Sequence, residues 1–279
     1  KVSNQLTNGI KIMLANDDIG NLGRLGNQMF QYTALRGVAD RHGYGYCLPP
    51  REIVGTRDLN CSNSDISIFE CFKLPDAPRG VSNYPRVQES CGFNFDTNIW
   101  NGCPDNVSLY GYFQSEKYFK HIEHEIREAF TFADDFRVPT EEAFKSNFGD
   151  TEVIAIHLRR GDYLKYPHHP VQELSYYQKG LAELPSDIPV MIFSDGIEWC
   201  KEQEEFKDDR FIFAEGNHTG VDLCLMSLCT YHVIGNSSFS WWGSWLAKSK
   251  KTIAPSVWFA GPDAHKDLSD LYLPEWTII

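Results

Sequence analysis

Residues 153–162 have the sequence VIAIHLRRGD, an apolar run that ends in a polar and cationic group. The run from Val153 to Ile156 is short and rich in β-branched residues, which is typical of a central strand in a parallel sheet covered on both faces. Ligands of open α/β sheets bind outside the carboxyl ends of the strands, where this stretch places a His, two Arg, a Gly and an Asp. A guanidinium fork binds a phosphate or carboxylate through two parallel hydrogen bonds. The stretch therefore predicts an α/β fold with an anion site at the end of this strand.

Residues 233–247, with the sequence VIGNSSFSWWGSWLA, predict a second strand that opens into a helix. Ser237 or Ser238 is a good N-cap, and the free N–H groups and dipole of a helix N-terminus attract anions. The Trp residues of this helix are expected in the core. Two adjacent Arg residues can by themselves be a solvated surface pair, but the two stretches together offer Arg and N–H donors to one ligand. A diphosphate is the simplest ligand of this kind.

Four motifs in this sequence resemble those of the α-1,2-fucosyltransferases of glycosyltransferase family 11. They are GRLGNQMFQYTALRGVA at 23–39, GYFQSEKYF at 111–119, HLRRGD at 157–162 and NSSFSWWGSWLA at 236–247. The motifs keep the order of the family and together span most of the chain. The resemblance implies a GT-B fold, in which two Rossmann-like domains face each other across a cleft, and GDP-β-L-fucose as the sugar donor.

The second half of the chain alternates apolar runs with helical patterns, as at Val190–Ser194 and Tyr231–Ile234. Such alternation predicts right-handed parallel crossovers in a doubly wound sheet. The first half opens with an expected strand at Ile10–Ala15, a loop that contains glycines, and a helix from about Asn27 to Arg41.

The rest of the first half is less regular. Residues 51–104 contain many Pro, Ser, Asn and aromatic residues, and we expect loops there that shape an acceptor surface. The charged stretch at 134–150 carries Pro139 and suits a domain junction. We therefore expect an acceptor-side domain at residues 1–150 and a GDP-fucose-binding domain at residues 151–279.

The predicted chemistry depends on Arg159. By resemblance to fucosyltransferases with an H-x-R-R segment, Arg159 binds the β-phosphate and His157 lies near guanine or ribose. Arg160 is expected to bind the donor more weakly or to form an internal salt bridge. Asp162 is grouped with Arg159 as catalytic, either because it orients that guanidinium or because it caps the loop.

The other donor-binding candidates follow the neighbouring strands of the second half. Asp195 comes directly after the strand at 190–194, and Asp222 enters a helix at the same sheet edge, where it suits the N1–H and N2–H donors of guanine. The remaining candidates are those at the second strand–helix junction: Asn236, Ser237, Ser238 and Phe239.

The acceptor side has four candidates. By resemblance Asn27 and Gln28 face the donor or the acceptor, although both positions also suit polar residues in the first turn of a helix. Inversion at the anomeric carbon requires an acceptor for the proton of the incoming hydroxyl. Asp162, Glu116 and His168 are candidates for this base, and Glu116 equally suits a purely electrostatic position at a helix N-terminus.

Composition excludes several classes of protein. A net charge of −12 over 279 residues argues against a nucleic-acid partner. No apolar run approaches 18 residues, so we expect no membrane segment. The chain begins at Lys1, so an anchor could have been removed, and the compartment stays open: Golgi lumen in a eukaryote, cytoplasm in a bacterium or virus. The eight Cys residues show no zinc-site spacing and leave disulfides and free thiols equally open.

These patterns predict an inverting α-1,2-fucosyltransferase that acts on a β-galactoside. No Asp-x-Asp motif is present, so Arg159 and the N–H groups near Ser237 are expected to stabilise the leaving diphosphate without a metal or other cofactor. A fucosyltransferase acting on a protein or another glycan is one alternative. A non-catalytic carbohydrate-binding protein is the other, with stacking residues at Tyr84, Phe93, Phe95 and Trp100.

Overall fold

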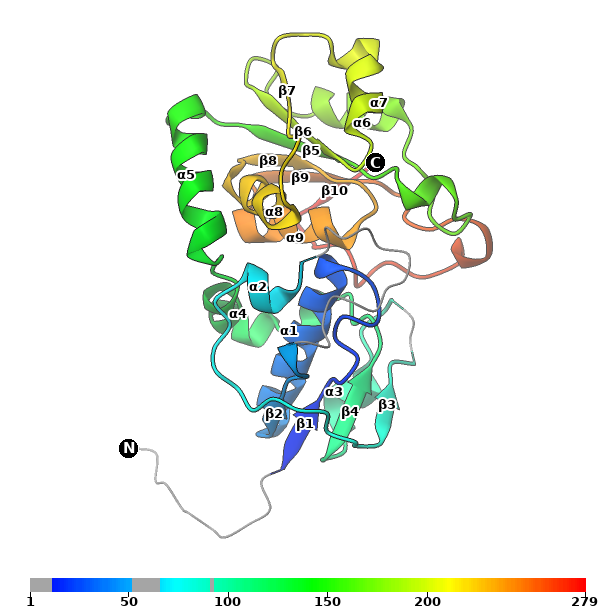
Figure 1. Cartoon of the computed structure of the whole chain (residues 1–279). Helices are drawn as coiled ribbons and strands as arrows, with labels where there is room; N and C mark the ends of the chain where they lie inside the picture. The colour runs from blue at the N-terminus through cyan, green and yellow to red at the C-terminus, as the bar shows by residue number, and fades with distance from the viewer. Residues whose placement is uncertain (1–11, 52–65, 91–92) are drawn as a thin grey trace.

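The computed structural model describes residues 12–51, 66–90 and 93–279. The described chain forms two parallel β-sheets with helices packed against them (Figure 1). A four-stranded sheet belongs to the first half of the chain and a six-stranded sheet to the second half. The α/β class and the two-sheet arrangement expected from the sequence are confirmed.

The four-stranded sheet has the order β2-β1-β4-β3, and all of its pairings are parallel. Its central strand β1 is buried at Leu14 and Ala15, which pack under helix α1. Helix α1 begins at Leu25, two residues before the expected start, and ends at Gly43, whose φ of 68° closes the helix in the left-handed conformation. The elements of this half are β1 (Met13–Ala15), α1 (Leu25–His42), β2 (Gly45–Cys47), α2 (Ile68–Cys71), β3 (Arg86–Gln88), α3 (Thr97–Gly102), β4 (Val107–Tyr110) and α4 (Glu123–Ala129).

The six-stranded sheet has the order β10-β9-β8-β5-β6-β7 and is also parallel throughout. Strand β5 lies inside this sheet, pairs with β6 and β8, and is buried at all five positions. The apolar run at Val153–Ile156 therefore forms the central strand that the sequence predicted. The elements are α5 (Asp134–Phe148), β5 (Ile154–Leu158), α6 (Leu174–Ala182), β6 (Val190–Ser194), α7 (Ile197–Glu202), β7 (Phe211–Phe213), α8 (Thr219–Leu228), β8 (Tyr231–Val233), α9 (Ser238–Ala247), β9 (Lys251–Ala254) and β10 (Thr277–Ile278).

Helices α8 and α9 lie between the six-stranded sheet and the half that contains α1 (Figure 1). Phe30 of α1 packs against Trp241 and Trp242 of α9, with ring centroids 4.7 and 4.8 Å apart. The indole N–H of Trp242 donates to the carbonyl of Gly26 at 3.0 Å. The expected core position of the Trp residues is confirmed, and one hydrophobic cluster joins the two halves. The domain boundary at residue 150 stays a prediction.

Several expectations for the first half need correction. Most of the charged stretch at 134–150 is the helix α5, which contains Pro139, packs along α8 and leads from the first half into β5; its role as a domain junction stays a prediction. Residues 51–104 hold α2, β3 and α3, although 52–65 and 91–92 lie outside the described residues. Glu116, expected at a helix N-terminus, lies in a short 3₁₀ turn at Glu116–Tyr118 that Ser115 caps, and the α-helix that follows, α4, begins at Glu123. Only the part of the expected first strand from Met13 onward is described.

Candidate active site between the two sheets

A cavity of about 760 Å³ lies at the carboxyl ends of strands β5, β6 and β8 and is closed on its other side by residues of the first half. This position agrees with the rule that ligands of open α/β sheets bind beyond the carboxyl ends of their strands. Of the residues predicted to bind the donor, all except Arg160 line this cavity. The fold thus brings together predicted donor residues that lie up to 82 positions apart in the sequence, from His157 to Phe239.

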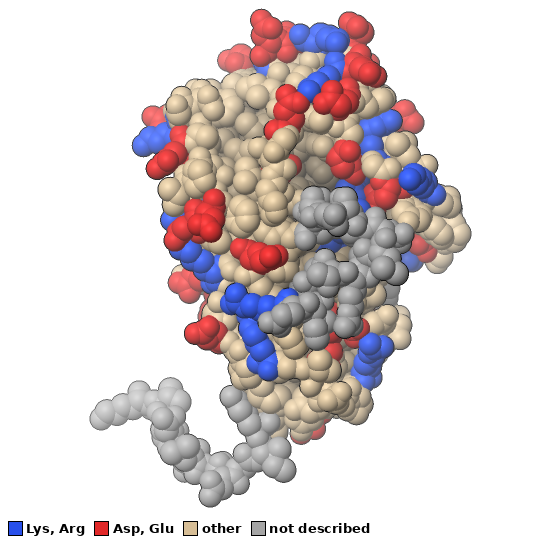
Figure 2. Space-filling view, viewed as in Figure 1, with Lys and Arg blue, Asp and Glu red and all other residues tan. Residues whose placement is uncertain are grey.

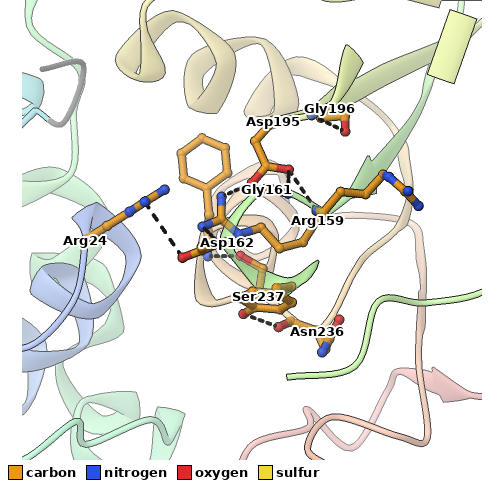
Figure 3. Close-up of polar contacts among 12 residues, drawn as sticks. Arg24, Arg159, Gly161, Asp162, Asp195, Gly196, Asn236 and Ser237 are labelled. Carbon is orange, nitrogen blue, oxygen red and sulfur yellow. Dashed lines mark hydrogen bonds and ion pairs between the residues drawn. The ribbon is translucent and has the colours of Figure 1, made fainter. Parts of the chain in front are cut away.

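Arg159 is the central cation of the cavity. Its two terminal nitrogens lie 2.5 Å from Asp162 and 2.5 Å from Asp195, and its side chain is only 14% exposed (Figure 3). A second cation, Arg24, enters from the first half and lies 3.7 Å from the other oxygen of Asp162. The two carboxylates hold the guanidinium of Arg159 in one orientation. Charges of both signs are therefore fixed in place before a ligand arrives, which lowers the reorganisation needed on binding.

Asp195 organises the loop after β5. One of its oxygens accepts hydrogen bonds from the backbone N–H groups of Arg160, at 2.8 Å, and Gly161, at 3.1 Å. A Cβ at Gly161 would lie 2.4 Å from the other oxygen of Asp195, so only glycine fits there. The carboxylate of Asp195, which directly follows β6, therefore explains why a Gly stands at position 161 after the two Arg residues. Asp195 therefore both orients the side chain of Arg159 and fixes the loop that carries it.

Two helix N-termini, one from each half, meet at the cavity. Ser237 is the N-cap of α9, and its hydroxyl accepts from the N–H of Phe239 at 3.3 Å, as the sequence predicted. Ser237, Ser238 and Phe239 all line the cavity. A Cβ at Gly26, in the first turn of α1, would lie 2.7 Å from the backbone nitrogen of Phe239. The first turns of two helices thus place their positive ends at the same cavity.

Burial controls the protonation of two further cavity residues. His157 is fully enclosed at the end of β5, and loss of solvent lowers its pKa to about 4, so its ring is neutral near pH 7. Asp222, in the first turn of α8, accepts from the side-chain amide of Asn217 at 2.9 Å. Burial raises the pKa of this carboxyl to about 6. A hydrogen-bonding group of this kind suits the N–H edge of a purine base.

Three candidates do not line the cavity. The guanidinium of Arg160 lies 3.4 Å over the ring of Trp199, because its side chain leaves the sheet on the side opposite to Arg159. Gln28 is buried in α1, and its oxygen accepts from the N–H of Ile68 at 3.1 Å. Glu116 lines a separate hollow, where it accepts from the indole N–H of Trp245 at 2.9 Å. The structure therefore places these three side chains away from the cavity, and Glu116 lies in the separate hollow instead of on the acceptor side.

The other acceptor-side candidates do line the cavity. Asn27 accepts from the side-chain amide of Gln114 at 2.7 Å, and His168 lies 3.3 Å from Asp263. Asn236 also lies on the wall, but its amide nitrogen donates to the carbonyls of Pro170 and Trp258 and so ties loops together.

Sequence reasoning missed several cavity residues. Arg24 and Gln114 lie within quoted motifs but had been given no role. Phe259, Asp263 and Lys266 come from the loop after β9, for which no pattern had suggested a site. The rule that sites lie at the carboxyl ends of parallel strands was the available signal, since β9 ends at Ala254.

Among the described residues, no group of three or more His, Cys, Asp or Glu side chains is arranged to hold a metal ion. The six described cysteines are free thiols; Cys61 and Cys91 lie outside the described residues.

No helix within the described ranges is both long and apolar enough to span a bilayer. Acidic and basic side chains are interspersed over the face shown in Figure 2.

The fold and the position of the cavity define the class first. The structure of NodZ α-1,6-fucosyltransferase soaked with GDP-fucose matches 90% of this chain and 97% of its own, with a TM-score of 0.56 at 12% identity. The chain therefore has the GT-B fold, as the resemblance implied.

The family follows from the sequence comparison. The family described as "Glycosyl transferase family 11" matches residues 94–279, and this chain belongs to that family. The α-1,2-colitosyltransferase of Escherichia coli is 32% identical over 271 residues, which cover 85% of this chain and 90% of the relative. The galactoside α-(1,2)-fucosyltransferase 2 of Oryctolagus cuniculus is 24% identical over 282 residues, covering 92% and 75%. The chain is thus a glycosyltransferase, and the interpretation as a non-catalytic binding protein is wrong.

Proposed function

We propose that this chain transfers L-fucose from GDP-β-L-fucose to the 2-hydroxyl of a terminal galactoside, with inversion and without a metal ion. The observation that carries the proposal is the meeting of Arg159 and the first turn of α9 at one cavity. The names of the relatives, which include α-1,2 transfer and galactoside acceptors, support the linkage and the acceptor class.

The charge balance of the reaction explains the role of these groups. As the bond to fucose breaks, negative charge gathers on the β-phosphate of GDP while the sugar becomes cation-like. The guanidinium of Arg159 and the N–H groups at the start of α9 are fixed donors for that charge, each contributing about 10²-fold or more in rate by analogy with oxyanion donors. Arg24 adds a second cation from the opposite half. These donors replace the cation that many glycosyltransferases hold with an Asp-x-Asp motif.

The attack of the acceptor hydroxyl requires a group that takes its proton. Asp162 is held between Arg159 and Arg24, so its oxygens are engaged by cations. His168 lines the cavity, and its imidazole lies 3.3 Å from the carboxylate of Asp263, which can orient the ring toward the acceptor hydroxyl. We assign the proton to His168. The variant His168→Gln should lower kcat while the KM for GDP-fucose stays unchanged; unchanged kcat would contradict the assignment.

Colitose is the alternative donor sugar that the relatives suggest. The Escherichia coli relative transfers colitose, which is the 3-deoxy analogue of L-fucose. The two sugars differ by one hydroxyl, and a site built to hydrogen-bond that hydroxyl rejects the deoxy analogue strongly, whereas a site that leaves it unbonded accepts both.

The test uses the wild-type protein with lactose, EDTA and either GDP-fucose or GDP-colitose, followed by NMR of the product. An α-1,2-linked fucose formed in the presence of the chelator would support donor, linkage, inversion and metal independence together. Faster transfer from GDP-colitose would replace fucose by colitose in the proposal. GDP-fucose that is bound or hydrolysed while lactose stays unmodified would leave the donor site intact and favour a protein or a different glycan as the acceptor.

A further inference from the structure

The wall of the cavity contains an aromatic cluster to which the proposed donor chemistry gives no role. Phe93 and Tyr112 of the first half lie with ring centroids 5.9 Å apart and planes at 17°. Phe93 also packs against Phe259 of the second half at 4.4 Å. All three line the cavity, so the wall is shared between the two halves.

Within this cluster, Tyr112 is the most exposed ring. Tyr112 is 37% exposed, whereas Phe93 and Phe259 are 9% and 7% exposed. Phe93 stacks on Tyr112 and is itself backed by Phe259. An exposed ring in a cavity, backed by other rings, presents a flat apolar surface at small entropic cost because few rotamers are lost on binding.

The backbone of Tyr112 is held in place by a buried carboxylate. One oxygen of Glu89 accepts from the N–H groups of Tyr112 and Phe113, each at 3.0 Å. Phe113 is fully buried with a φ of 54°, a left-handed conformation that costs a non-glycine residue free energy. The next residue, Gln114, bonds Asn27 in the cavity. The left-handed backbone of Phe113 and the buried carboxyl of Glu89 thus fix the segment Gly111–Gln114, whose residues Tyr112 and Gln114 line the cavity.

Polar groups face the same part of the cavity. The ammonium of Lys266 lies 4.6 Å from the ring centre of Phe93 and 3.0 Å from Asp263. Asp263 in turn lies 3.3 Å from His168. A flat apolar ring next to a short array of charged donors and acceptors is the combination that recognises a pyranose, which has a C–H face and a rim of hydroxyls.

We propose that Tyr112, on the segment Gly111–Gln114, is the stacking platform of the acceptor subsite and that Lys266 and Asp263 bond the hydroxyls of the stacked sugar. The ligand class is a hexopyranoside with a continuous C–H face. A galactoside has this face, because its axial 4-hydroxyl leaves the hydrogens of C3, C4 and C5 together on the opposite side. This inference rests on the proposed function and adds the residues that select the acceptor.

The test separates acceptor binding from donor binding. Tyr112→Ala, Tyr112→Phe and the control Tyr84→Ala, whose ring lies outside the cavity, are compared with the wild type. The KM for lactose should rise about tenfold or more in Tyr112→Ala and stay near the wild-type value in Tyr112→Phe and Tyr84→Ala. The affinity for GDP, measured by calorimetry, should be unchanged in all variants.

A second readout does not depend on turnover. Saturation-transfer NMR of methyl β-galactoside with the GDP-loaded protein should show the strongest transfer to the hydrogens on C3, C4 and C5 and should lose it in Tyr112→Ala. Transfer that is absent from the wild type, or equal in Tyr112→Ala, would overturn the platform, as would a parallel loss of GDP affinity in that variant. If the galactoside binds in this way but fucose is not transferred, the subsite stands and the proposed reaction fails.

Discussion

Arg159 illustrates how a single side chain depends on its neighbours. Its guanidinium is oriented by Asp162 and Asp195 at 2.5 Å each, and the loop that carries it is held by hydrogen bonds from its backbone to Asp195. A Lys in this position would keep the charge but could not bond both carboxylates and a phosphate in the same plane. The geometry of the fork, and not the charge alone, is what the site uses.

Arg159→Ala should therefore lower kcat/KM for GDP-fucose by about 10²- to 10³-fold. Arg159→Lys should recover only a small part of this loss. Both effects are measured by steady-state kinetics, with circular dichroism as the check that the fold is intact. Activity of Arg159→Lys close to the wild-type value would show that a point charge suffices.

The buried carboxyl of Glu89 makes the stability of the protein depend on pH, and the substitution Glu89→Gln separates its contribution from that of other titrating groups. Burial, together with the nearby Asp96, raises the pKa of Glu89 to about 7 against the opposing hydrogen bonds from Phe113, Tyr112 and Tyr118. The folded protein therefore binds this proton more tightly than the unfolded chain, in which the pKa of the carboxyl is near 4.5. As the pH rises from about 4.5 through 7, this contribution to stability is lost, by up to about 3 kcal/mol.

Glu89→Gln keeps an oxygen that accepts from the same N–H groups but removes the titration. The free energy of unfolding of the wild type minus that of Glu89→Gln should rise as the pH falls from 8 to 5, when measured by urea denaturation. The exposed Glu128, with a side chain 71% accessible, provides the control substitution Glu128→Gln, which should show no such trend. A difference that does not change with pH would mean that Glu89 is ionised throughout.

At the scale of elements, the decisive contact is the close approach of α1 and α9. Gly26 and the first turn of α9 are so close that an added Cβ would meet the backbone of Ser238 and Phe239 at 2.7 Å. Backbone atoms cannot rotate away as a flexible side chain does. Because both helices begin at the cavity, their separation determines how the two halves of the site face each other.

Gly26→Ala should accordingly lower the stability by about 1–3 kcal/mol, the usual cost of overpacking, and weaken GDP binding severalfold. Thermal unfolding and calorimetry measure the two effects. Gly102→Ala is the matched control, since a Cβ there meets nothing within 4 Å. Equal behaviour of the two variants would show that the helices can separate at no cost.

At the scale of the whole molecule, the two sheets share one hydrophobic cluster. Trp242 of the second half contacts Phe30, Phe119 and Phe130 of the first half, with ring centroids 4.8 to 5.4 Å apart. Its side chain is fully buried. A chain whose halves share a core is expected to unfold as one cooperative unit.

Urea unfolding followed by tryptophan fluorescence and by far-ultraviolet circular dichroism should give coincident single transitions. Trp242→Ala should lower the free energy of unfolding by about 3–5 kcal/mol, because a large buried ring is removed and a cavity is left between the halves. Trp199→Ala, at the Arg160 stack within the second half, should cost less. Two separate transitions in the wild type would contradict the shared core.

Local sequence was sufficient for several features of the site. The buried strand at 153–156 and the cap at Ser237 each follow from a few neighbouring residues, since period and capping are local properties. The expectation that parallel strands end at one edge placed Arg159, Asp195 and Asp222 near one another before any contact was known.

Only the tertiary structure decided which side chains face the cavity. Adjacent residues of an extended chain point to opposite sides, so Arg159 faces the site while Arg160 stacks on Trp199, although the two are identical in the sequence. Glu116 and Gln28 are likewise directed to other partners by contacts with Trp245 and Ile68. The aromatic wall depends on rings that are as many as 166 positions apart, for Phe93 and Phe259, and such contacts have no local signal. The sequence by itself therefore determined the fold, the family and the donor strand ends, whereas the acceptor wall and the direction of each side chain arose only when the two halves packed together.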